Sequence, residues 1–343
     1  MGKSILITGG AGYIGQLLVM HLSELDSITT IIVIDKEPVP DRLKNIQKLR
    51  YVQKNLVDNS WEEEVSIYKP EIVIHCAWQI RESYTNQQKH TNWNINGSKR
   101  VFDFAFTNNF VRRLIHYSTV ASYGAFDSNS LDEFFKEETR LRPSPYSYAE
   151  EKRLVENTLR ESFEKLKENK KFSDLQVAVI RPASITGPFG RLQYPRFGLQ
   201  SVLLGFSRKR FLNLNKILFS FIPVTPKWCR QFVYEEDIVD ITILLALKDQ
   251  LINDYDVFNA APGDVLLGKD MSALSGKQLI VLPPFLIRLV FFLAWHLSRG
   301  RIPTAQGSWR GYSFPIVVDG SKITKMYGYK YKLNSREALT VKD

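Results

Sequence analysis

The chain has 343 residues, of which 44% are hydrophobic, and a formal net charge of +10. This length and apolar content are enough for one large or two modest domains, and the well-mixed charges exclude an intrinsically disordered chain. The two cysteines, Cys76 and Cys229, form no Cys-x-x-Cys or Cys/His pattern. This argues against a disulfide scaffold or a metal site and favours a reducing, cytoplasmic environment.

Lysine and arginine are scattered along the chain, with local concentrations at 164–171 and 207–210. Such scatter is typical of a solvated surface, so we expect no nucleic-acid partner. A basic surface would also suit an anionic small substrate or an anionic membrane. The first residues run straight into a strand-like segment, so we expect no signal peptide.

The first half of the chain alternates short runs rich in Ile and Val with longer segments of helical periodicity. The short runs are at 4–9, 29–35, 71–77, 112–119 and 176–182. Nearly continuous apolar strands joined by crossover helices are typical of a buried parallel sheet. The pattern therefore predicts an α/β fold, a doubly wound parallel sheet of the Rossmann type.

Glycines follow the first predicted strand at a regular spacing: Gly9, Gly12 and Gly15 are three residues apart, and Tyr13 and Ile14 begin the next helix. Glycine allows a tight turn and a close approach to a pyrophosphate, and the free N–H groups of the helix N-terminus favour phosphate binding. A tight turn without a ligand is the alternative. The strand-turn-helix context favours a dinucleotide site.

Asp35 ends the second predicted strand, 20 residues after Gly15. A carboxylate at this place can accept hydrogen bonds from an adenosine ribose and would repel a 2′-phosphate, which favours NAD over NADP. Lys36 follows and could soften this preference. A helix cap or loop role for Asp35 is the alternative.

Residues 144–152, SPYSYAEEK, contain two tyrosines and a lysine. On a helix, Tyr148 and Lys152, four residues apart, share a face, whereas Tyr146, six residues from Lys152, does not. The spacing therefore allows Tyr148 and Lys152 to act together and leaves Tyr146 as a packing or rim residue. A chance pairing on a lysine-rich helix is the alternative.

The strand-helix rhythm breaks after residue 183 and returns at 230–247 and 254–262. We therefore expect a Rossmann domain of residues 1–182 and 229–262, and a smaller, discontinuous substrate lobe of residues 183–228 and 263–343. Ligands of doubly wound folds bind at the carboxyl ends of the strands, so substrate is expected in the cleft that the lobe covers.

One apolar run, 279–297, is interrupted by Pro283, Pro284 and Arg288. The uninterrupted part is too short to span a membrane, so a buried or partly exposed amphipathic helix is expected. Contact with a membrane surface is the less favoured alternative.

Seven segments, taken together, carry a family resemblance. They are TGGAGYIG (8–15), NINGS (94–98), YSTVASYG (117–124), YAEEK (148–152), RPASITGP (181–188), RQFVYEEDIV (230–239) and VDGSKITKMYGY (318–329). In this order they resemble the extended short-chain dehydrogenase/reductase superfamily, of the NAD-dependent epimerase/dehydratase type that acts on nucleoside-diphosphate sugars. The resemblance covers most of the chain.

The resemblance implies a catalytic set of Thr119, Tyr148 and Lys152, with NAD as the cofactor and a homodimeric assembly. Besides the glycine turn, Asp35 and the Tyr/Lys pair, it assigns to the cofactor site Asn55, Leu56, Cys76, Ala77, Asn94, Ser118 and Pro182. It assigns Thr119, Ser184, Arg230 and Arg310 to the substrate. Ser184 and Asn55 depart from the family's usual Asn and Asp.

The chemistry expected of the set is proton and hydride transfer at a secondary alcohol. A lysine ammonium one turn from Tyr148 would lower the pKa of the phenol toward the working range and bind the nicotinamide ribose. Val120 and Ala121 stand where dehydratases and decarboxylases carry carboxylates, which leaves epimerisation or simple oxidoreduction.

Three functions therefore remain open. The first is a nucleotide-sugar epimerase or related oxidoreductase. The second is a reductase or dehydrogenase of a less polar, hydroxysteroid-like substrate, which apolar stretches at 211–223 and 285–297 would suit if they are not ordinary core. The third is a catalytically silent NAD-binding scaffold, which the intact catalytic set disfavours.

Overall fold

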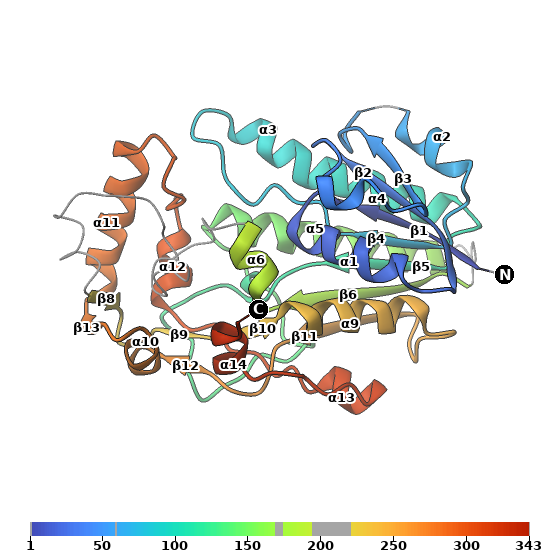
Figure 1. Ribbon diagram of the computed structural model, residues 1–343. Helices are drawn as coiled ribbons and strands as arrows, with labels where there is room; N and C mark the ends of the chain where they lie inside the picture. The colour runs from blue at the N-terminus through green and yellow to red at the C-terminus, as the bar shows by residue number, and fades with distance from the viewer. Residues whose placement is uncertain (1, 59, 169–173, 194–220, 343) are drawn as a thin grey trace. The chain divides into compact units, whose positions relative to one another are not determined.

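The computed structural model describes residues 2–58, 60–168, 174–193 and 221–342 (Figure 1). The chain forms two compact units, each assembled from separate stretches. The first unit contains residues 1–118, 151–181 and 238–258. The second unit contains residues 119–150, 182–237 and 259–343.

A seven-stranded sheet forms the centre of the first unit, with strand order β11-β6-β5-β4-β1-β2-β3. The strands are β1 (Lys3–Thr8), β2 (Ile28–Asp35), β3 (Leu49–Gln53), β4 (Ile72–His75), β5 (Arg113–Tyr117), β6 (Gln176–Pro182) and β11 (Tyr255–Ala260). The pairings among β1 to β6 are parallel, and the direction of winding reverses between β1 and β4. This confirms the predicted doubly wound α/β fold.

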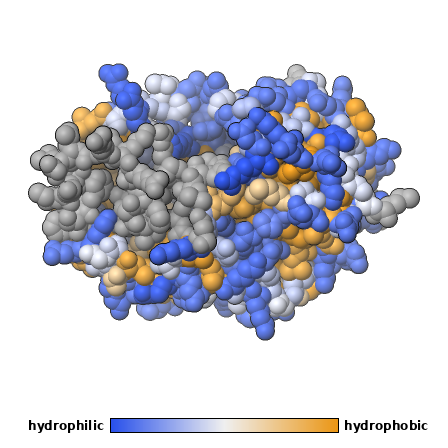
Figure 2. Space-filling view, in the orientation of Figure 1, coloured by the Kyte–Doolittle hydropathy of each residue, from blue (hydrophilic) through white to orange (hydrophobic). Residues whose placement is uncertain are grey.

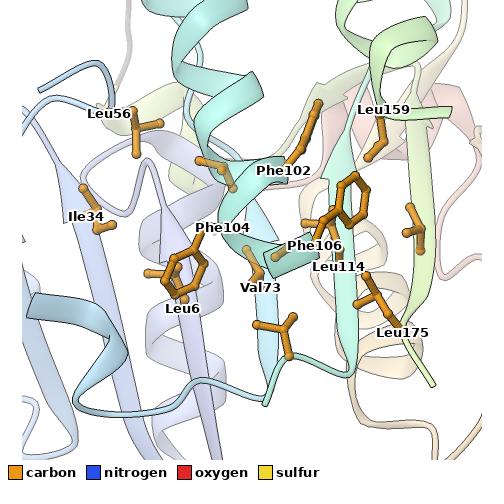
Figure 3. Close-up of a cluster of buried hydrophobic side chains, with 14 of the residues drawn as sticks. Leu6, Ile34, Leu56, Val73, Phe102, Phe104, Phe106, Leu114, Leu159 and Leu175 are labelled. Carbon is orange, nitrogen blue, oxygen red and sulfur yellow. The ribbon is translucent and has the colours of Figure 1, made fainter. Parts of the chain in front are cut away.

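Helices pack against this sheet in the first unit. They are α1 (Tyr13–Ser23), α2 (Trp61–Ser66), α3 (Gln87–Thr91), α4 (Gly97–Thr107), α9 (Glu235–Leu247) and most of α5 (Ser147–Glu168), with short turns η1 (Asp41–Leu43) and η2 (Asn92–Asn96). Figure 3 shows Phe102 and Phe104 of α4 beside Leu6 and Val73 of the sheet, all within one buried cluster. The Ile- and Val-rich strands are buried on both faces for this reason.

The second unit contains three small two-stranded sheets, β10-β7, β12-β9 and β13-β8. Their strands are β7 (Ser184–Thr186), β8 (Phe221–Val224), β9 (Cys229–Arg230), β10 (Phe232–Tyr234), β12 (Leu266–Leu267) and β13 (Gln278–Val281). The helical segments are η3 (Val120–Tyr123), α6 (Pro188–Gln193), α10 (Gly268–Ser275), α11 (Pro284–Leu297), α12 (Ser308–Ser313), α13 (Lys322–Tyr327) and α14 (Ser335–Thr340). A separate core, which includes Trp228, Phe232 and Ile287, holds these pieces together.

Several sequence predictions can be compared with these elements. The five predicted strands are present with slightly different ends, while β3 was not predicted because LRYVQ lacks a continuous apolar run. Residues 119–150 and 229–237 group with the second unit, whereas the sequence placed them in the Rossmann domain. The domain boundaries and the substrate cleft that the sequence predicts stay predictions. Most of 211–223, and 207–210, lie outside the described residues.

The 279–297 run forms β13 and α11, and α11 is partly exposed, as expected. Within the described part of the chain, no helix combines the length and the apolar character that crossing a membrane requires. Figure 2 shows hydrophilic residues over most of the described surface on one face, with smaller hydrophobic patches among them.

Candidate coenzyme and active site

The glycine turn between β1 and α1 has the geometry that a phosphate site needs. Gly9 has a φ of +77°, in the left-handed region, and the Gly12 amide donates to the Gly9 carbonyl at 3.0 Å. Gly12 is the N-cap of α1 and offers no side-chain cap, so the first amides of the helix have no intrahelical acceptor. Tyr13, Ile14 and Gly15 supply these amides.

The spacing of the glycines has a steric reason. A Cβ at Gly15 would lie 2.1 Å from the Gly9 oxygen, so the close packing of the helix on the turn requires glycine there. A Cβ at Gly12 would meet only the Gly9 oxygen, at 3.1 Å, and otherwise open space. The turn is thus tight on its inner side and open in front of the helix, which fits a cradle for a pyrophosphate.

Asp35, at the end of β2, is tied to this turn. The Ala11 amide donates to Oδ2 of Asp35 at 2.9 Å, and the Glu37 amide donates to Oδ1 at 3.0 Å. Burial raises the pKa of Asp35, and the two N–H donors partly offset this. The sequence had predicted the carboxylate but not its bond to Ala11.

The ends of β1 and β4 also come together. The Cys76 amide donates to the Thr8 carbonyl at 3.2 Å, and a Cβ at Gly9 would lie 2.6 Å from the Ala77 backbone. Ala77 therefore lies directly against the turn. Burial raises the pKa of the Cys76 thiol, so the thiol is neutral and packs as an apolar group.

Four further residues assigned from the sequence lie at the ends of β3, β5 and β6 or just after them. Asn55 accepts a hydrogen bond from the Val57 amide at 3.3 Å, and Leu56 belongs to the buried core. Ser118 donates its amide to Ile180, and its buried hydroxyl has no hydrogen-bond partner among the described residues. Pro182 ends β6.

Beneath the turn, a chain of hydrogen bonds links β1, β4 and α4. Thr8 Oγ1 and His75 Nδ1 are 2.7 Å apart, and His75 Nε2 is 2.8 Å from Ser98 Oγ, which donates to the Asn94 carbonyl at 2.6 Å. Burial lowers the pKa of His75 to about 3, so the ring is neutral. The chain is a structural connection between the glycine turn and the Asn94 segment.

Asn94 connects to the helix that carries the catalytic pair. Its amide nitrogen donates to Glu151 Oε2 at 2.7 Å, and its oxygen accepts from the Gln79 amide at 2.8 Å. Glu151 also accepts from Thr91 and lies 3.4 Å from His90. Because Glu151 directly precedes Lys152, this buried network positions the start of α5. Sequence reasoning had found Asn94 but not Glu151 or His90.

Thr119 and Tyr148 are hydrogen-bonded to each other in the second unit. Thr119 is buried at the N-cap of η3, where its side chain also accepts from the Ala121 amide at 3.2 Å. Tyr146 lies beside them, with its ring centroid 5.7 Å from that of Tyr148. The structure thus pairs the two hydroxyls that the sequence assigned to catalysis.

Lys152 is in α5, four residues after Tyr148, and is almost fully buried. Its ammonium donates to the Tyr117 carbonyl and lies 3.7 Å from the centroid of the Trp78 ring. Burial lowers the pKa of Lys152 to about 7. The sequence did not predict Trp78, although its place just after β4 is a usable signal.

The expected lowering of the Tyr148 pKa is corrected by the structure. Burial raises the pKa of Tyr148, and the hydrogen bond with Thr119 opposes this only in part. Lys152 has a lowered pKa of its own and is hydrogen-bonded to the Tyr117 carbonyl, so its charge does not reverse the effect of burial on the pKa of Tyr148.

Of the predicted substrate residues, Arg230 has the most informative surroundings. Among the described residues, no carboxylate pairs with its guanidinium, which makes a 3.4 Å hydrogen bond to the Cys229 carbonyl and lies 5.8 Å from the centroid of the Trp228 ring. Burial lowers the pKa of Arg230, and Tyr312 and Tyr146 are near enough to offset this in part. A half-buried cation of this kind, without a carboxylate partner among the described residues, suits an anionic ligand.

Ser184 and Arg310 occupy separate places in the second unit. Ser184 is in β7, where its amide donates to the Gln231 carbonyl at 3.2 Å. The Arg310 guanidinium lies 5.1 Å from the Trp309 ring centroid and 5.7 Å from that of Phe126. Arg310 therefore stacks on aromatic rings, a contact that the sequence did not predict.

The fold and the glycine turn define a dinucleotide-binding protein of the doubly wound α/β class. The model of the NAD dependent epimerase/dehydratase family matches residues 5–261, and the chain belongs to this family. This match confirms the family that the sequence predicted, which is a family of NAD-dependent enzymes.

Curated relatives are distant and differ in their reactions. The chain is 28% identical to a dTDP-D-glucose 4,6-dehydratase of Dictyostelium discoideum, over 74% of this chain and 58% of the relative. It is 24% identical to a sterol-4-alpha-carboxylate 3-dehydrogenase (decarboxylating) of Saccharomyces cerevisiae, over 71% of this chain and 65% of the relative. The chain thus spans less than two thirds of these relatives.

Solved structures show the same fold over the whole chain. MoeE5 in complex with UDP-glucuronic acid and NAD has a TM-score of 0.70 and 19% identity, covering 99% of this chain and 97% of the other. A UDP-glucose 4-epimerase of Thermotoga maritima with UDP-glucose has a TM-score of 0.69 and 21% identity, covering 98% and 96%.

Proposed function

We propose that this protein is an NAD-dependent epimerase or oxidoreductase that acts on a secondary alcohol of a nucleotide sugar. The observation that carries the proposal is the hydrogen-bonded pair of Thr119 and Tyr148, with Lys152 one helical turn further along α5. A hydroxyl acceptor, a phenol and a nearby amine are the groups that proton transfer to and from a carbinol needs.

The chain's own residues have the following roles in this proposal. Thr119 orients the substrate hydroxyl, and Tyr148, as the phenolate, removes its proton while the carbinol carbon loses a hydride. The ammonium form of Lys152 favours the phenolate and offsets part of the cost of burial. NAD+, when bound, supplies the hydride acceptor. Return of the hydride to the opposite face of the resulting carbonyl carbon, with the proton from Tyr148, would give the epimer.

The residues around the glycine turn fit NAD. The open space in front of Gly12 and the first amides of α1, which point out of the helix N-terminus, would hold the pyrophosphate. Asp35, already oriented by two amides, would accept from the adenosine ribose and disfavour a 2′-phosphate.

Arg230 supports a substrate with a diphosphate. A largely desolvated guanidinium without a carboxylate partner among the described residues is stabilised when an anion binds, and its planar donors match phosphate oxygens. Solved structures of the same fold contain UDP-glucose or UDP-glucuronic acid. Ser184 and Arg310 remain proposed substrate contacts with weaker support.

The proposal favours epimerisation or oxidoreduction over dehydration, although the first relatives are dehydratases. Val120 and Ala121 follow Thr119 directly in η3. Neither side chain can donate or accept the proton that elimination of water requires. A homodimer in the cytoplasm is proposed from the family resemblance, and light scattering of the purified protein tests the dimer.

A second candidate is oxidation or reduction of a less polar substrate. The observation that favours it is the similarity to a sterol-4-alpha-carboxylate 3-dehydrogenase. Such an enzyme would have no use for a diphosphate anchor, so the role of Arg230 separates the two candidates.

The deciding experiment gives the NAD-loaded protein either UDP- and dTDP-sugars or steroid-like ketones. A nucleotide-sugar epimerase interconverts sugars without net consumption of NAD, and its ligands raise the melting temperature by mass action. Consumption of added NADH with an apolar ketone alone would overturn the first candidate in favour of the second. If neither occurs, the protein is a silent NAD-binding scaffold.

A matched pair of variants tests the diphosphate site. We expect Arg230→Gln to raise KM for a nucleotide sugar by about ten- to a hundredfold, the loss of one charge-assisted contact. Arg310→Gln serves as the comparison and should change KM much less, because Arg230 is the proposed main anchor of the diphosphate. Equal effects would contradict the assignment of Arg230.

A further inference from the structure

One face of α11 (Pro284–Leu297) is covered with exposed apolar side chains. Phe285, Leu289, Phe292 and Leu293 are 67%, 50%, 57% and 44% exposed. Their spacing of i, i+4, i+7 and i+8 places them on one side of the helix. They therefore form a continuous apolar surface, called here the α11 face.

The opposite side of α11 holds the helix in the second unit. Ile287 and Trp295 are only 3% and 9% exposed, and the ring of Phe291 lies 5.7 Å from that of Tyr312. Figure 1 shows α11 next to α12, in agreement with their contacts. Since the helix is anchored by these residues, the α11 face is not needed to keep it folded.

More apolar side chains extend the exposed surface beyond the α11 face. They belong to the same helix or to the segments just before and after it: Leu279, Ile280, Val281, Val290, Leu297 and Ile302. Exposed apolar residues are ordinarily scattered, as Ile67 and Ile252 are in the first unit. A cluster of this size instead marks a surface that binds a partner.

The charges in the segments of chain that contain and flank α11 are of one sign. Residues 271–318 contain five Lys and Arg and no Asp or Glu. The five are Lys277, Arg288, Arg299, Arg301 and Arg310. An apolar face bordered by cations complements anionic lipid headgroups over an acyl interior. It opposes pairing with a second copy, because the same cations would then meet each other.

The length of the helix decides how it would meet a membrane. Its 14 residues measure about 21 Å at a helical rise of 1.5 Å per residue, which is shorter than a hydrocarbon core of about 30 Å. The helix can therefore lie in the interface, with its exposed side toward the acyl chains, but cannot span it.

We propose that the α11 face docks on an anionic lipid surface, so that the protein is a peripheral membrane protein. The apolar residues of the face enter the boundary between headgroups and acyl chains, and the exposed Arg299 and Arg301, just after the helix, contact the headgroup phosphates. This docking is independent of the coenzyme and catalytic residues and goes beyond the proposed reaction.

Flotation of the full-length protein with lipid vesicles tests the proposal. We expect the protein to bind phosphatidylcholine vesicles that contain phosphatidylglycerol. Binding to vesicles of pure phosphatidylcholine should be weaker by about tenfold or more, because the cations of the protein then have no anionic headgroups to contact. Leu289→Gln, Phe292→Gln and Leu293→Gln in one chain should weaken binding to the anionic vesicles by about tenfold or more. Arg299→Gln with Arg301→Gln should weaken it at low salt as well.

Ile67→Gln with Ile252→Gln is the matched control, since these side chains are 77% and 61% exposed but isolated. It should leave vesicle binding unchanged. Circular dichroism and NAD binding check that each variant is folded. If the triple variant does not fold, Phe285→Gln alone replaces it.

Three results would overturn the proposal: no binding to anionic vesicles, equal binding by the apolar variant, or equal binding to neutral and anionic vesicles. A change from dimer to monomer in the variant, without vesicle binding, would assign the face to a second copy instead. A lack of enzymatic activity has no bearing on this test, so the two proposals fail separately.

Discussion

The two units of the chain differ in how many exposed apolar side chains they gather in one place. The first unit buries charged groups: Glu156 and Arg181 form an ion pair in which each side chain is 3% exposed, and Lys152 is 4% exposed. The second unit leaves Phe285 and Leu297 exposed to 67% and 82%. The exposed apolar side chains of the first unit, such as Ile67 and Ile252, are far apart in sequence, whereas the second unit gathers many of its own on and around α11.

This difference follows from how each unit is built. The parallel sheet of the first unit is covered by α4 and α5, so polar groups at the ends of its strands are enclosed and must pair with one another. The second unit has only two-stranded sheets, which bury less and leave surface for ligands or partners. The comparison makes four predictions, given from the largest expected effect to the smallest.

Replacement of Tyr148 tests whether the second unit supplies a catalytic hydroxyl. We expect Tyr148→Phe to reduce kcat by about 10²- to 10⁴-fold, the usual contribution of a general acid–base, with NAD affinity little changed. Tyr146→Phe, two residues earlier, is the control and should retain most activity. Steady-state kinetics on an identified substrate measure both. A Tyr148→Phe enzyme with near-normal kcat would remove the proposed mechanism.

Removal of a carboxylate compares the buried and exposed ion pairs directly. Glu156→Ala leaves Arg181 charged and buried, and should lower the free energy of unfolding by about 3–5 kcal/mol. Asp270→Ala breaks the more exposed pair with Arg336 in the second unit and removes the acceptor of the Leu267 amide at the start of α10, so it should cost about 1–2 kcal/mol in all. Urea titration gives both values. Equal losses of unfolding free energy in the two variants would show that burial of the Glu156–Arg181 pair has no special effect on stability.

The pH dependence of stability reports the burial of Lys152. Its pKa is about 7 in the folded protein and 10.5 when unperturbed, so between these values the unfolded chain binds more protons. The free energy of unfolding is therefore not reduced by Lys152 above pH 10.5, where the amine is neutral in both states. It falls as the pH decreases from 10.5 to 7, because the amine is then protonated in the unfolded chain but not in the folded one. Relative to Lys152→Met, which does not titrate, the protein should gain about 1.4 kcal/mol per pKa unit at most.

Thermal unfolding of both proteins at matched pH values checks this expectation, because other titrating groups cancel in the difference. A constant difference in melting temperature from pH 7 to 10 would mean that Lys152 stays charged in its buried place.

The glycine turn allows the smallest and most local test. Gly15→Ala places a Cβ 2.1 Å from the Gly9 oxygen and should cost about 1–3 kcal/mol of stability as well as NAD affinity. Gly12→Ala meets the same oxygen at 3.1 Å and should mainly weaken NAD binding, because its Cβ projects into the open cradle. Thermal melts with and without NAD separate the two effects. If both variants bind NAD normally, the turn is not the phosphate site.

Prediction from the sequence worked best where neighbouring residues decide the structure. The strand at 176–182, the turn at 9–15 and the shared face of Tyr148 and Lys152 depend on spacing along the chain, and all are present. The strand at 49–53 was missed because its outward residues are polar, and only pairing with β2 makes it a strand. The Glu151–Asn94 bond joins residues far apart in sequence, which no local pattern reports.

The sequence by itself therefore determined the doubly wound sheet, the family and the identity of the candidate catalytic groups, because these follow from periodicity and from motifs of adjacent residues. Only the tertiary structure decided their electrostatics and surroundings: the lowered pKa of Lys152 beneath Trp78, the raised pKa of Tyr148 and the cation of Arg230. It also decided which side of α11 is exposed. Burial and local dielectric depend on every segment that packs around a group, and those segments come from all parts of the chain.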